Sequence, residues 1–287
     1  MDAIQAITLG VVQGLTEFLP ISSTAHLTLV PWFLGWKDPG LTFDVALHVG
    51  TLVAVTIYFF SDLKRMAVAW LSSLMRMLGL SQFFQKEMAG GDAYGTLAWL
   101  VIAGSVPAVV AGLSLEKWIE TTLRSPVVIA ATLIGVGILI AIADRLTRQR
   151  RDWTSLRLKD AILIGFAQAC ALVPGVSRSG ATITMGLFLG LNRKDAARFS
   201  FLLGFPVIFG STVFKLRHIF DDVALQELAP WMALGALAAA VSGYFCIAFL
   251  LRFLASQTMT VFVVYRIGLG VLILTLIARG FSLSTAA

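Results

Sequence analysis

The sequence has few charged residues and little cysteine. Asp, Glu, Lys and Arg supply 13% of its 287 residues, whereas 58% are hydrophobic, so we expect a polytopic membrane protein. Its two cysteines, Cys170 and Cys246, stand far apart in apolar segments, which argues against a disulfide framework or a cysteine metal site. The N-terminus lacks a basic region and a small-residue cleavage motif, so we expect the first apolar segment to be retained.

Acidic residues are outnumbered by basic ones, 16 to 22. In a membrane protein an excess of Lys and Arg is typical of cytoplasmic loops. The positive charge therefore predicts topology, and no nucleic-acid partner is expected. The most charged segment, residues 144–160, is expected to be a loop in the middle of the chain.

Polar residues interrupt an apolar stretch near the start of the chain. Residues 9–29 read LGVVQGLTEFLPISSTAHLTL, and Glu17 and Pro20 fall where a spanning helix would continue. A carboxylate inside a bilayer is costly unless it faces a protein interior or a wet cavity, and proline disfavours helix at the residue before it. We therefore expect two half-length helices that form a re-entrant hairpin over about residues 9–34.

Six longer apolar segments have the length of membrane spans. They lie at about residues 41–60, 96–115, 126–142, 199–214, 230–251 and 258–277. Between the first two, residues 61–95 mix basic and apolar side chains, which is typical of an amphipathic helix at a membrane surface.

A second interrupted stretch, residues 161–191, matches the first and reads AILIGFAQACALVPGVSRSGATITMGLFLGL. Three residues recur at an offset of 155 positions and the proline at 154: Gly10 and Gly165, Gln13 and Gln168, Ser22 and Ser177, Pro20 and Pro174. Each hairpin is followed by three spans, which end on the opposite side of the membrane, so the second unit begins inverted. The sequence predicts one all-α integral membrane domain, 1–287, built of two inverted-topology repeats, about 1–150 and 151–287.

Under this topology the two hairpin turns enter from opposite faces and meet near the midplane of the membrane. Most Lys and Arg then fall on the side that holds the 144–160 loop, which the positive-inside rule assigns to the cytoplasm. Both termini and the mouth of the first hairpin are therefore expected on the outer, periplasmic side.

Residues that can bind an anion follow both helix breaks. Ser22 and Ser23 come after Pro20, and Ser177 and Arg178 stand in the second turn. A helix N-terminus binds anions through its free N–H groups, and an arginine guanidinium fits phosphate oxygens. Two such N-termini and an arginine fit a diphosphate.

Two residues near the first break can move protons or bind a metal. His26 lies three residues after Ser23 on one helical face, so it can exchange a proton with Ser23 or with a phosphate oxygen. Glu17 has three alternatives: a divalent-metal ligand, a partner of Arg178 or His26, or a general base. The plainer alternatives are that the serines only cap helices and that Glu17 and Arg178 form a structural ion pair.

Three further polar residues lie in the predicted spans, and the sequence gives weaker reasons to assign them to the site. Arg266, in the last span, is either a third anion contact or a snorkelling side chain. Asp44 and His48, at the start of the first span, are expected to be packing or interfacial residues.

The segments GLTEFLPISSTAHL (14–27) and PGVSRSGATIT (174–184) resemble the two signature segments of the bacterial undecaprenyl-diphosphate phosphatase family, associated with bacitracin resistance. The resemblance covers nearly the full length and includes FSFLLGFP at 199–206 and the Tyr265-Arg266 pair. It implies an inner-membrane enzyme that hydrolyses the polyprenyl diphosphate lipid carrier to the monophosphate and inorganic phosphate, with support from Mg²⁺ or Ca²⁺. This step recycles the carrier for peptidoglycan synthesis.

The resemblance also assigns residues. It implies Glu17, Ser23 and His26 as catalytic, Glu17 also as the metal ligand, and Ser22, Ser177, Arg178, Thr182, Gln13 and Arg266 as diphosphate-binding. The family has Glu or Gln four residues before its fixed Glu, and Gln13 stands there, so Glu17 alone supplies a carboxylate at this turn. We expect Ser23, rather than metal-bound water, to attack phosphorus.

The main rival function is a polyprenyl-phosphate flippase or another secondary transporter, because inverted repeats with broken helices are also a transporter architecture. The pairing of the Ser23 hydroxyl with His26, which can carry a proton, favours the enzyme. The sequence leaves open whether the protein is a homodimer and whether a metal contacts protein or only phosphate.

Overall fold

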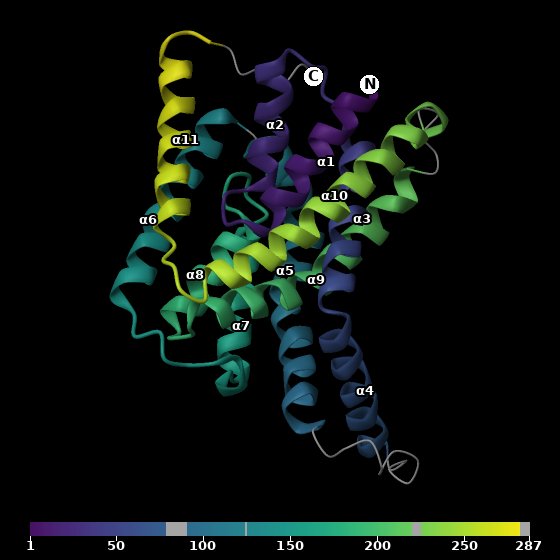
Figure 1. The fold of residues 1–287 in the computed structure, drawn as a ribbon, viewed down its shortest axis with the longest axis vertical. Helices are drawn as coiled ribbons and strands as arrows, with labels where there is room; N and C mark the ends of the chain where they lie inside the picture. The colour runs from purple at the N-terminus through teal and green to yellow at the C-terminus, as the bar shows by residue number, and fades with distance from the viewer. Residues whose placement is uncertain (79–90, 124, 220–224, 282–287) are drawn as a thin grey trace.

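The computed structural model describes residues 1–78, 91–123, 125–219 and 225–281, which contain eleven α-helices and one short 3-10 helix, η3 (Trp153–Ser155) (Figure 1). The all-α prediction is confirmed. The α-helices are α1 Ala3–Phe18, α2 Ser23–Leu34, α3 Leu41–Tyr58, α4 Phe60–Met77, α5 Gly91–Thr122, α6 Pro126–Leu146, α7 Leu158–Cys170, α8 Arg178–Phe188, α9 Arg193–Ile219, α10 Leu225–Phe253 and α11 Thr260–Ala278.

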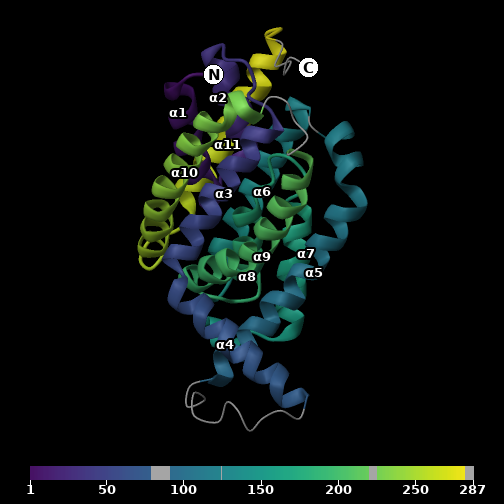
Figure 2. The ribbon, with the colours of Figure 1, turned by 90° about the vertical axis from the view of Figure 1, so that its right-hand side faces the viewer.

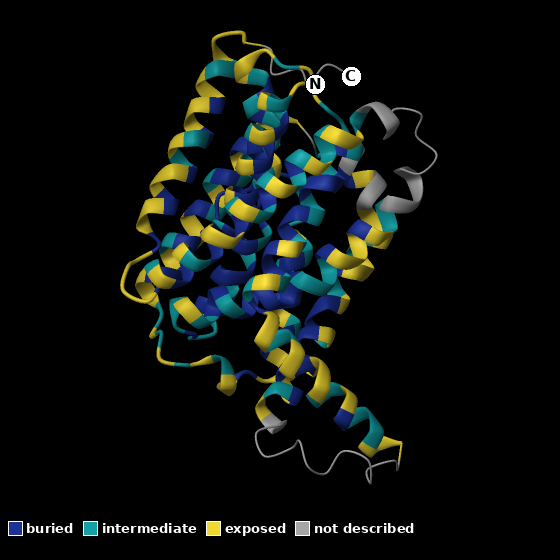
Figure 3. Cartoon of the chain, turned by 45° about the vertical axis from the view of Figure 1, so that its right-hand side comes forward, coloured by how far each residue is buried: buried dark blue, intermediate teal, exposed yellow. Residues whose placement is uncertain are grey.

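Within the described residues, six helices are long and apolar enough to cross a membrane: α3, α5, α6, α9, α10 and α11. They lie on the six predicted spans, so the protein is a multi-pass membrane protein. Many side chains on the outer surface of these helices are exposed (Figure 3) and apolar, as a lipid-facing surface requires. The predicted 144–160 loop is shorter than expected, because α6 continues to Leu146 and α7 begins at Leu158.

The predicted amphipathic helix is present as α4, although residues 79–90 of the segment, with Lys86, lie outside the described residues. α4 packs against α5, and α4 with the adjacent part of α5 projects beyond the other helices (Figures 1 and 2). Asp62 ties the pair to α9, since one carboxylate oxygen accepts from the Tyr94 hydroxyl at 3.1 Å and from Arg198 Nη2 at 2.7 Å. The location of α4 at a membrane surface stays a prediction.

The two predicted hairpins are formed by α1 with α2 and by α7 with α8. These helices have 16, 12, 13 and 11 residues, and at about 1.5 Å per residue each is shorter than the roughly 30 Å core of a bilayer. The prediction of half-length helices is therefore confirmed. Figure 1 shows α1 and α2 toward the end that holds the N-terminus, and α7 and α8 lower in the molecule.

The two turns share an unusual backbone conformation at equivalent positions. Ser22 has φ 76° and ψ 102°, and Ser177 has φ 72° and ψ 118°. Among the described residues these are the two non-glycine residues with positive φ, a conformation that costs about 1–3 kcal/mol and that tends to occur at functional sites. Each serine caps the helix that follows, with Oγ accepting from Ala25 N at 3.5 Å and Gly180 N at 3.1 Å.

The first arm of each hairpin crosses a helix of the other half of the chain at a glycine. α1 packs on α10, where a Cβ added to Gly10 would overlap the carbonyl oxygen of Gly235. α7 packs on α5, where a Cβ added to Gly165 would overlap the carbonyl oxygen of Gly104. The matched glycines therefore permit the same close helix approach in both halves.

Adding a methyl group at either crossing is expected to destabilise the protein. Gly10→Ala and Gly165→Ala should each cost about 1–3 kcal/mol, because the new Cβ must push two backbones apart. Gly112→Ala and Gly135→Ala are matched controls, since a Cβ there meets no atom within 4 Å. Thermal unfolding in detergent measures the difference. Equal melting temperatures for all four variants would contradict the tight crossings.

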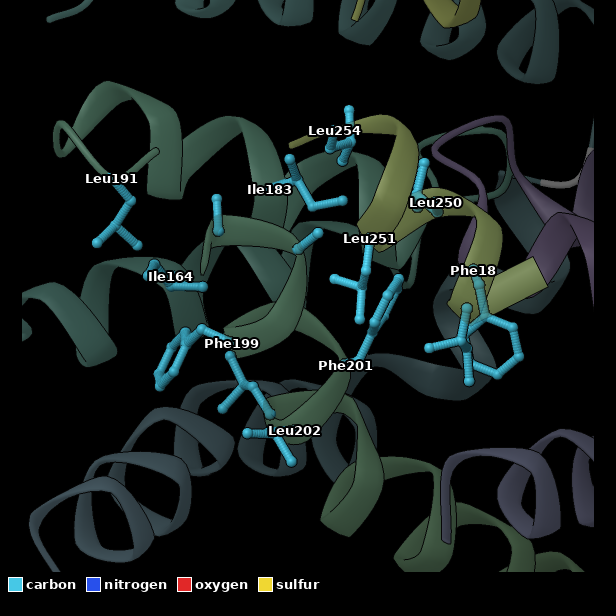
Figure 4. Close-up of a cluster of buried hydrophobic side chains, with 14 of the residues drawn as sticks. Phe18, Ile164, Ile183, Leu191, Phe199, Phe201, Leu202, Leu250, Leu251 and Leu254 are labelled. Atoms are coloured by element: carbon cyan, nitrogen blue, oxygen red, sulfur yellow. The ribbon is translucent and has the colours of Figure 1, made fainter. Parts of the chain in front are cut away.

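The largest buried apolar cluster lies next to the first turn (Figure 4). Phe18, the residue after Glu17, is fully buried and meets the Phe201 ring edge to face, with centroids 5.4 Å apart. This contact joins the end of α1 to α9. The backbone that carries Glu17 is thus held by core packing, which positions a charged side chain inside an apolar molecule.

Candidate active site

Glu17 lies at the point where the two hairpin turns meet. It is 7% exposed, and its Oε2 accepts from Ser23 Oγ at 2.9 Å and from Gln13 Nε2 at 3.2 Å. Its Oε1 accepts from Arg178 Nη2 at 3.3 Å. Ser23 and Arg178 are the first residues of α2 and α8. One carboxylate therefore joins the starts of both second arms.

The Arg178 guanidinium has one buried nitrogen without a hydrogen-bond partner among the described residues. Its Nη1 donates to the Ser200 carbonyl at 3.2 Å, whereas its Nε is buried without a partner among the described residues. A buried N–H without an acceptor is costly and calls for a ligand or water. Gly204 leaves room for this guanidinium, because a Cβ there would overlap Nη1. The arginine is thus held in place while a donor stays free.

The hydroxyls of the second turn contact other protein groups. Ser177 Oγ lies 3.2 Å from Ser179 Oγ, and Ser179 Oγ donates to the Leu19 carbonyl at 3.0 Å, across to the first hairpin. Thr182 is 1% exposed and lies 2.6 Å from Ser200 Oγ. The predicted residues are therefore brought together, and in this state Ser179 and Thr182 stabilise the turn that presents the α8 N-terminus.

His26 has partners other than the one that the sequence suggested. Its Nδ1 lies 2.7 Å from the Ser22 carbonyl, and its Nε2 lies 2.6 Å from the Tyr265 hydroxyl. The expected Ser23 partner is instead hydrogen-bonded to Glu17. The physical reason is that the bend at Ser22 turns Ser23 toward the last turn of α1, while His26 faces α11. His26 is 8% exposed, so it remains beside the turn.

Arg266 lies between the two hairpin turns, and the structure excludes one of its two sequence alternatives. It is fully buried, which rules out a snorkelling side chain in this structure, and its donors are engaged by backbone carbonyls. The acceptors are Leu133 O, Pro20 O, Thr132 O, Gly175 O and Val176 O, at 2.9–3.3 Å. Contact with phosphate through these N–H groups would require those bonds to break. Arg266 therefore joins both turns to α6 and α11.

Two residues that the sequence did not assign to the site contact it. His48, expected as a packing residue, has Nε2 4.0 Å from Glu17 Oε2 and Nδ1 2.8 Å from the Asp44 carbonyl. A histidine inside a membrane span is itself a sign of function, and that signal could have identified it. Tyr265 contacts His26, and its only sequence signal is its place beside Arg266.

The oxygen atoms around Glu17 could supply some of the ligands that a hard cation needs. The described residues contain no cluster of three or more His, Cys, Asp or Glu that could hold a metal ion. Gln13 is fully buried beside Glu17, and its Oε1 has no hydrogen-bond partner there. Carboxylate and amide oxygens are ligands of Mg²⁺ and Ca²⁺, and Mg²⁺ commonly completes its shell with substrate phosphates and water. The residues fit a cation held mainly by phosphate oxygens.

Comparison with known proteins identifies the family. The chain is 44% identical over 281 residues to an undecaprenyl-diphosphatase of Myxococcus xanthus, covering 98% of this chain and 91% of the relative. It is 49% identical over 280 residues to undecaprenyl-diphosphatase 2 of Stutzerimonas stutzeri, covering 96% and 98%. A family model described as bacitracin resistance protein BacA matches residues 6–272. The chain therefore belongs to the bacitracin resistance protein BacA family.

Proposed function

We propose that the protein hydrolyses undecaprenyl diphosphate to undecaprenyl phosphate and inorganic phosphate. The observation that carries this assignment is the meeting of Glu17, Ser23 and Arg178 at two helix N-termini inside a multi-pass membrane protein of the BacA family. The curated relatives with the name undecaprenyl-diphosphatase support it. The reaction recycles the lipid carrier for peptidoglycan synthesis and gives resistance to bacitracin.

We place the diphosphate between the first turns of α2 and α8. The N–H groups of these turns and the free Nε of Arg178 supply donors for its oxygens. The positive φ values of Ser22 and Ser177 persist only where the surrounding structure fixes both turns, so the donors are in place before substrate arrives. The exposed apolar faces of the spans supply the environment for the polyprenyl chain.

We propose Ser23 as the nucleophile and Glu17 as its base. Glu17 Oε2 accepts the Ser23 hydroxyl at 2.9 Å, so it takes the proton as Oγ forms a bond to the terminal phosphorus. The bond from that phosphorus to the bridging oxygen breaks, and undecaprenyl phosphate leaves. His26 activates the water that then hydrolyses phosphoserine or, when both of its ring nitrogens are protonated, protonates the leaving oxygen. Arg178 stabilises charge on the phosphoryl oxygens.

We propose Mg²⁺ or Ca²⁺ as the cation that accompanies the diphosphate. Glu17 and the Gln13 amide oxygen would hold it from the protein side, and it would neutralise charge on the phosphate oxygens when bound. The unpaired Gln13 Oε1 supports this choice.

We also propose the inverted-repeat architecture and its orientation in the bacterial inner membrane, with both termini and the site mouth on the periplasmic side. The matched glycine crossings and the matched φ values of Ser22 and Ser177 support the repeats 1–150 and 151–287. Figure 1 shows the N-terminus and the end of α11 at the same end of the molecule. Lys86 and Arg124 are among the basic residues whose distribution between the two sides predicted this orientation, and both lie outside the described residues.

Cysteine labelling in whole cells is expected to place residue 150 inside and residue 37 outside. In a background without Cys170 and Cys246, Arg150→Cys should react with an impermeant maleimide only after lysis, and Lys37→Cys should react before it. Labelling of Cys at position 150 in intact cells would overturn the orientation. Both positions are in polar segments, so the substitutions avoid the spans.

Phosphate release by purified protein tests the function. In detergent, without any gradient, the protein should release inorganic phosphate from a polyprenyl diphosphate. A flippase or another secondary transporter of similar architecture would leave the diphosphate intact. The absence of release at any concentration of Mg²⁺ or Ca²⁺ would favour that alternative.

A further inference from the structure

We propose that Tyr265 is a positioning residue for His26 that keeps its Nε2 oriented for phosphate chemistry. The inference rests on the proposed diphosphatase function, in which His26 transfers a proton. It follows from two contacts: His26 Nε2 lies 2.6 Å from the Tyr265 hydroxyl, and the two rings stack with centroids 5.6 Å apart and planes 11° apart.

The hydrogen bonds of His26 define its tautomer. Its Nδ1 lies 2.7 Å from the Ser22 carbonyl, which can only accept, so Nδ1 carries a proton. In the neutral ring Nε2 is then the acceptor, and the Tyr265 hydroxyl donates to it. Since Nδ1 is committed to Ser22, Nε2 is the nitrogen that can exchange a proton with a phosphate oxygen. Tyr265 thus contacts the reactive edge of the ring.

The position of Tyr265 is itself fixed by its neighbour in α11. Arg266 is fully buried and donates to Pro20 O at 2.9 Å in the first turn and to Gly175 O at 2.9 Å in the second. The backbone at Tyr265 is therefore anchored to both turns at once. This anchoring fixes the backbone from which the Tyr265 side chain reaches the imidazole.

Tyr265 also differs from His26 in exposure. Tyr265 is 45% exposed, whereas His26 is 8% exposed. The phenol can therefore shift when a phosphate oxygen approaches Nε2, while the bond from Nδ1 to the Ser22 carbonyl keeps the imidazole in place.

Tyr265→Phe separates the hydroxyl from the ring, because it keeps the stacking partner. We expect kcat to fall about 3- to 10-fold, a factor equivalent to about one net hydrogen bond, because the imidazole then spends less time in the orientation that presents Nε2 to the phosphate. KM should change less than twofold, and the melting temperature should change little. Tyr265→Leu, which also removes stacking, should lower kcat further. Tyr244→Phe is the matched control, since Tyr244 is a half-exposed tyrosine of α10 whose ring meets Tyr58 and Phe245, and it should keep wild-type kcat.

Nitrogen NMR of the imidazoles tests the hydrogen bond directly, because a purely structural role of Tyr265 would not change the His26 nitrogen signals. The chain has three histidines, so ¹⁵N-histidine labelling yields few signals, and the loss of one in His26→Gln assigns His26. In the wild type Nδ1 should be protonated and Nε2 hydrogen-bonded. Tyr265→Phe should shift Nε2 toward the position of a free acceptor, and Tyr244→Phe should not.

An unchanged His26 spectrum in Tyr265→Phe would overturn the proposal, as would wild-type kcat in that variant. The spectrum is recorded without substrate, so it tests the Tyr265 contact even if the wild type releases no phosphate. If the wild type is inactive but Tyr265→Phe still shifts the Nε2 signal, the proposed function is rejected and the structural contact is kept. The two failures are therefore distinguishable.

Discussion

Arg178→Ala is expected to lower kcat/KM for polyprenyl diphosphate by about 10³-fold, because it removes the guanidinium that stabilises charge on the transferred phosphoryl group. It should also destabilise the protein. Arg178 Nη2 is paired with Glu17, and both side chains are largely buried, at 13% and 7% exposure. Loss of one member of a buried pair costs about 3–5 kcal/mol, since the other charge is left without compensation.

A double-variant cycle separates the two effects of Arg178. The double variant Glu17→Gln with Arg178→Ala has no unpaired carboxylate, so its melting temperature should recover part of what Arg178→Ala loses, while its turnover stays near background. Phosphate release and thermal unfolding are measured on the same four proteins. If Arg178→Ala retained near-wild-type kcat/KM, the diphosphate would not be bound by this guanidinium. Full recovery of turnover in the double variant would also contradict the assignment.

Ser23→Ala is expected to abolish nearly all turnover if Ser23 attacks phosphorus, as we propose. If the hydroxyl only donates a hydrogen bond to the transition state, the loss in kcat should be about 10²–10³-fold. Rapid quenching of the wild type with substrate labelled in the terminal phosphate should trap phosphoserine at Ser23. Clear residual turnover in Ser23→Ala, without a trapped adduct, would assign the attack to water.

Thr24→Ala is the matched control for Ser23→Ala. Thr24 is the next residue of α2 but is exposed, whereas Ser23 is only partly exposed. We expect its removal to leave kcat within about twofold, as is usual for a surface substitution away from the reacting groups. A loss as large as that of Ser23→Ala would indicate damage to the α2 N-terminus rather than loss of a nucleophile.

The helices and the turns of this protein could be predicted from local sequence. Six apolar segments of span length became α3, α5, α6, α9, α10 and α11. Proline and serine within apolar stretches indicated where α1 and α7 end, because a missing backbone donor and a side-chain cap act within a few residues of the position that carries them. The match of Ser22 with Ser177 likewise reappears as a shared backbone conformation.

The partners of the site residues were decided only by tertiary structure. Ser23 bonds Glu17, His26 bonds Tyr265, and both choices depend on how α1, α2 and α11 are oriented around the turns. In the sequence, Arg266 and Arg178 are both single arginines within predicted membrane segments. In the structure, however, the Arg266 side chain donates to five backbone carbonyls. The partners of Arg266 and His26 across the fold come from segments 90 to 246 residues away in the sequence. They depend on how those segments pack together, which local sequence does not encode.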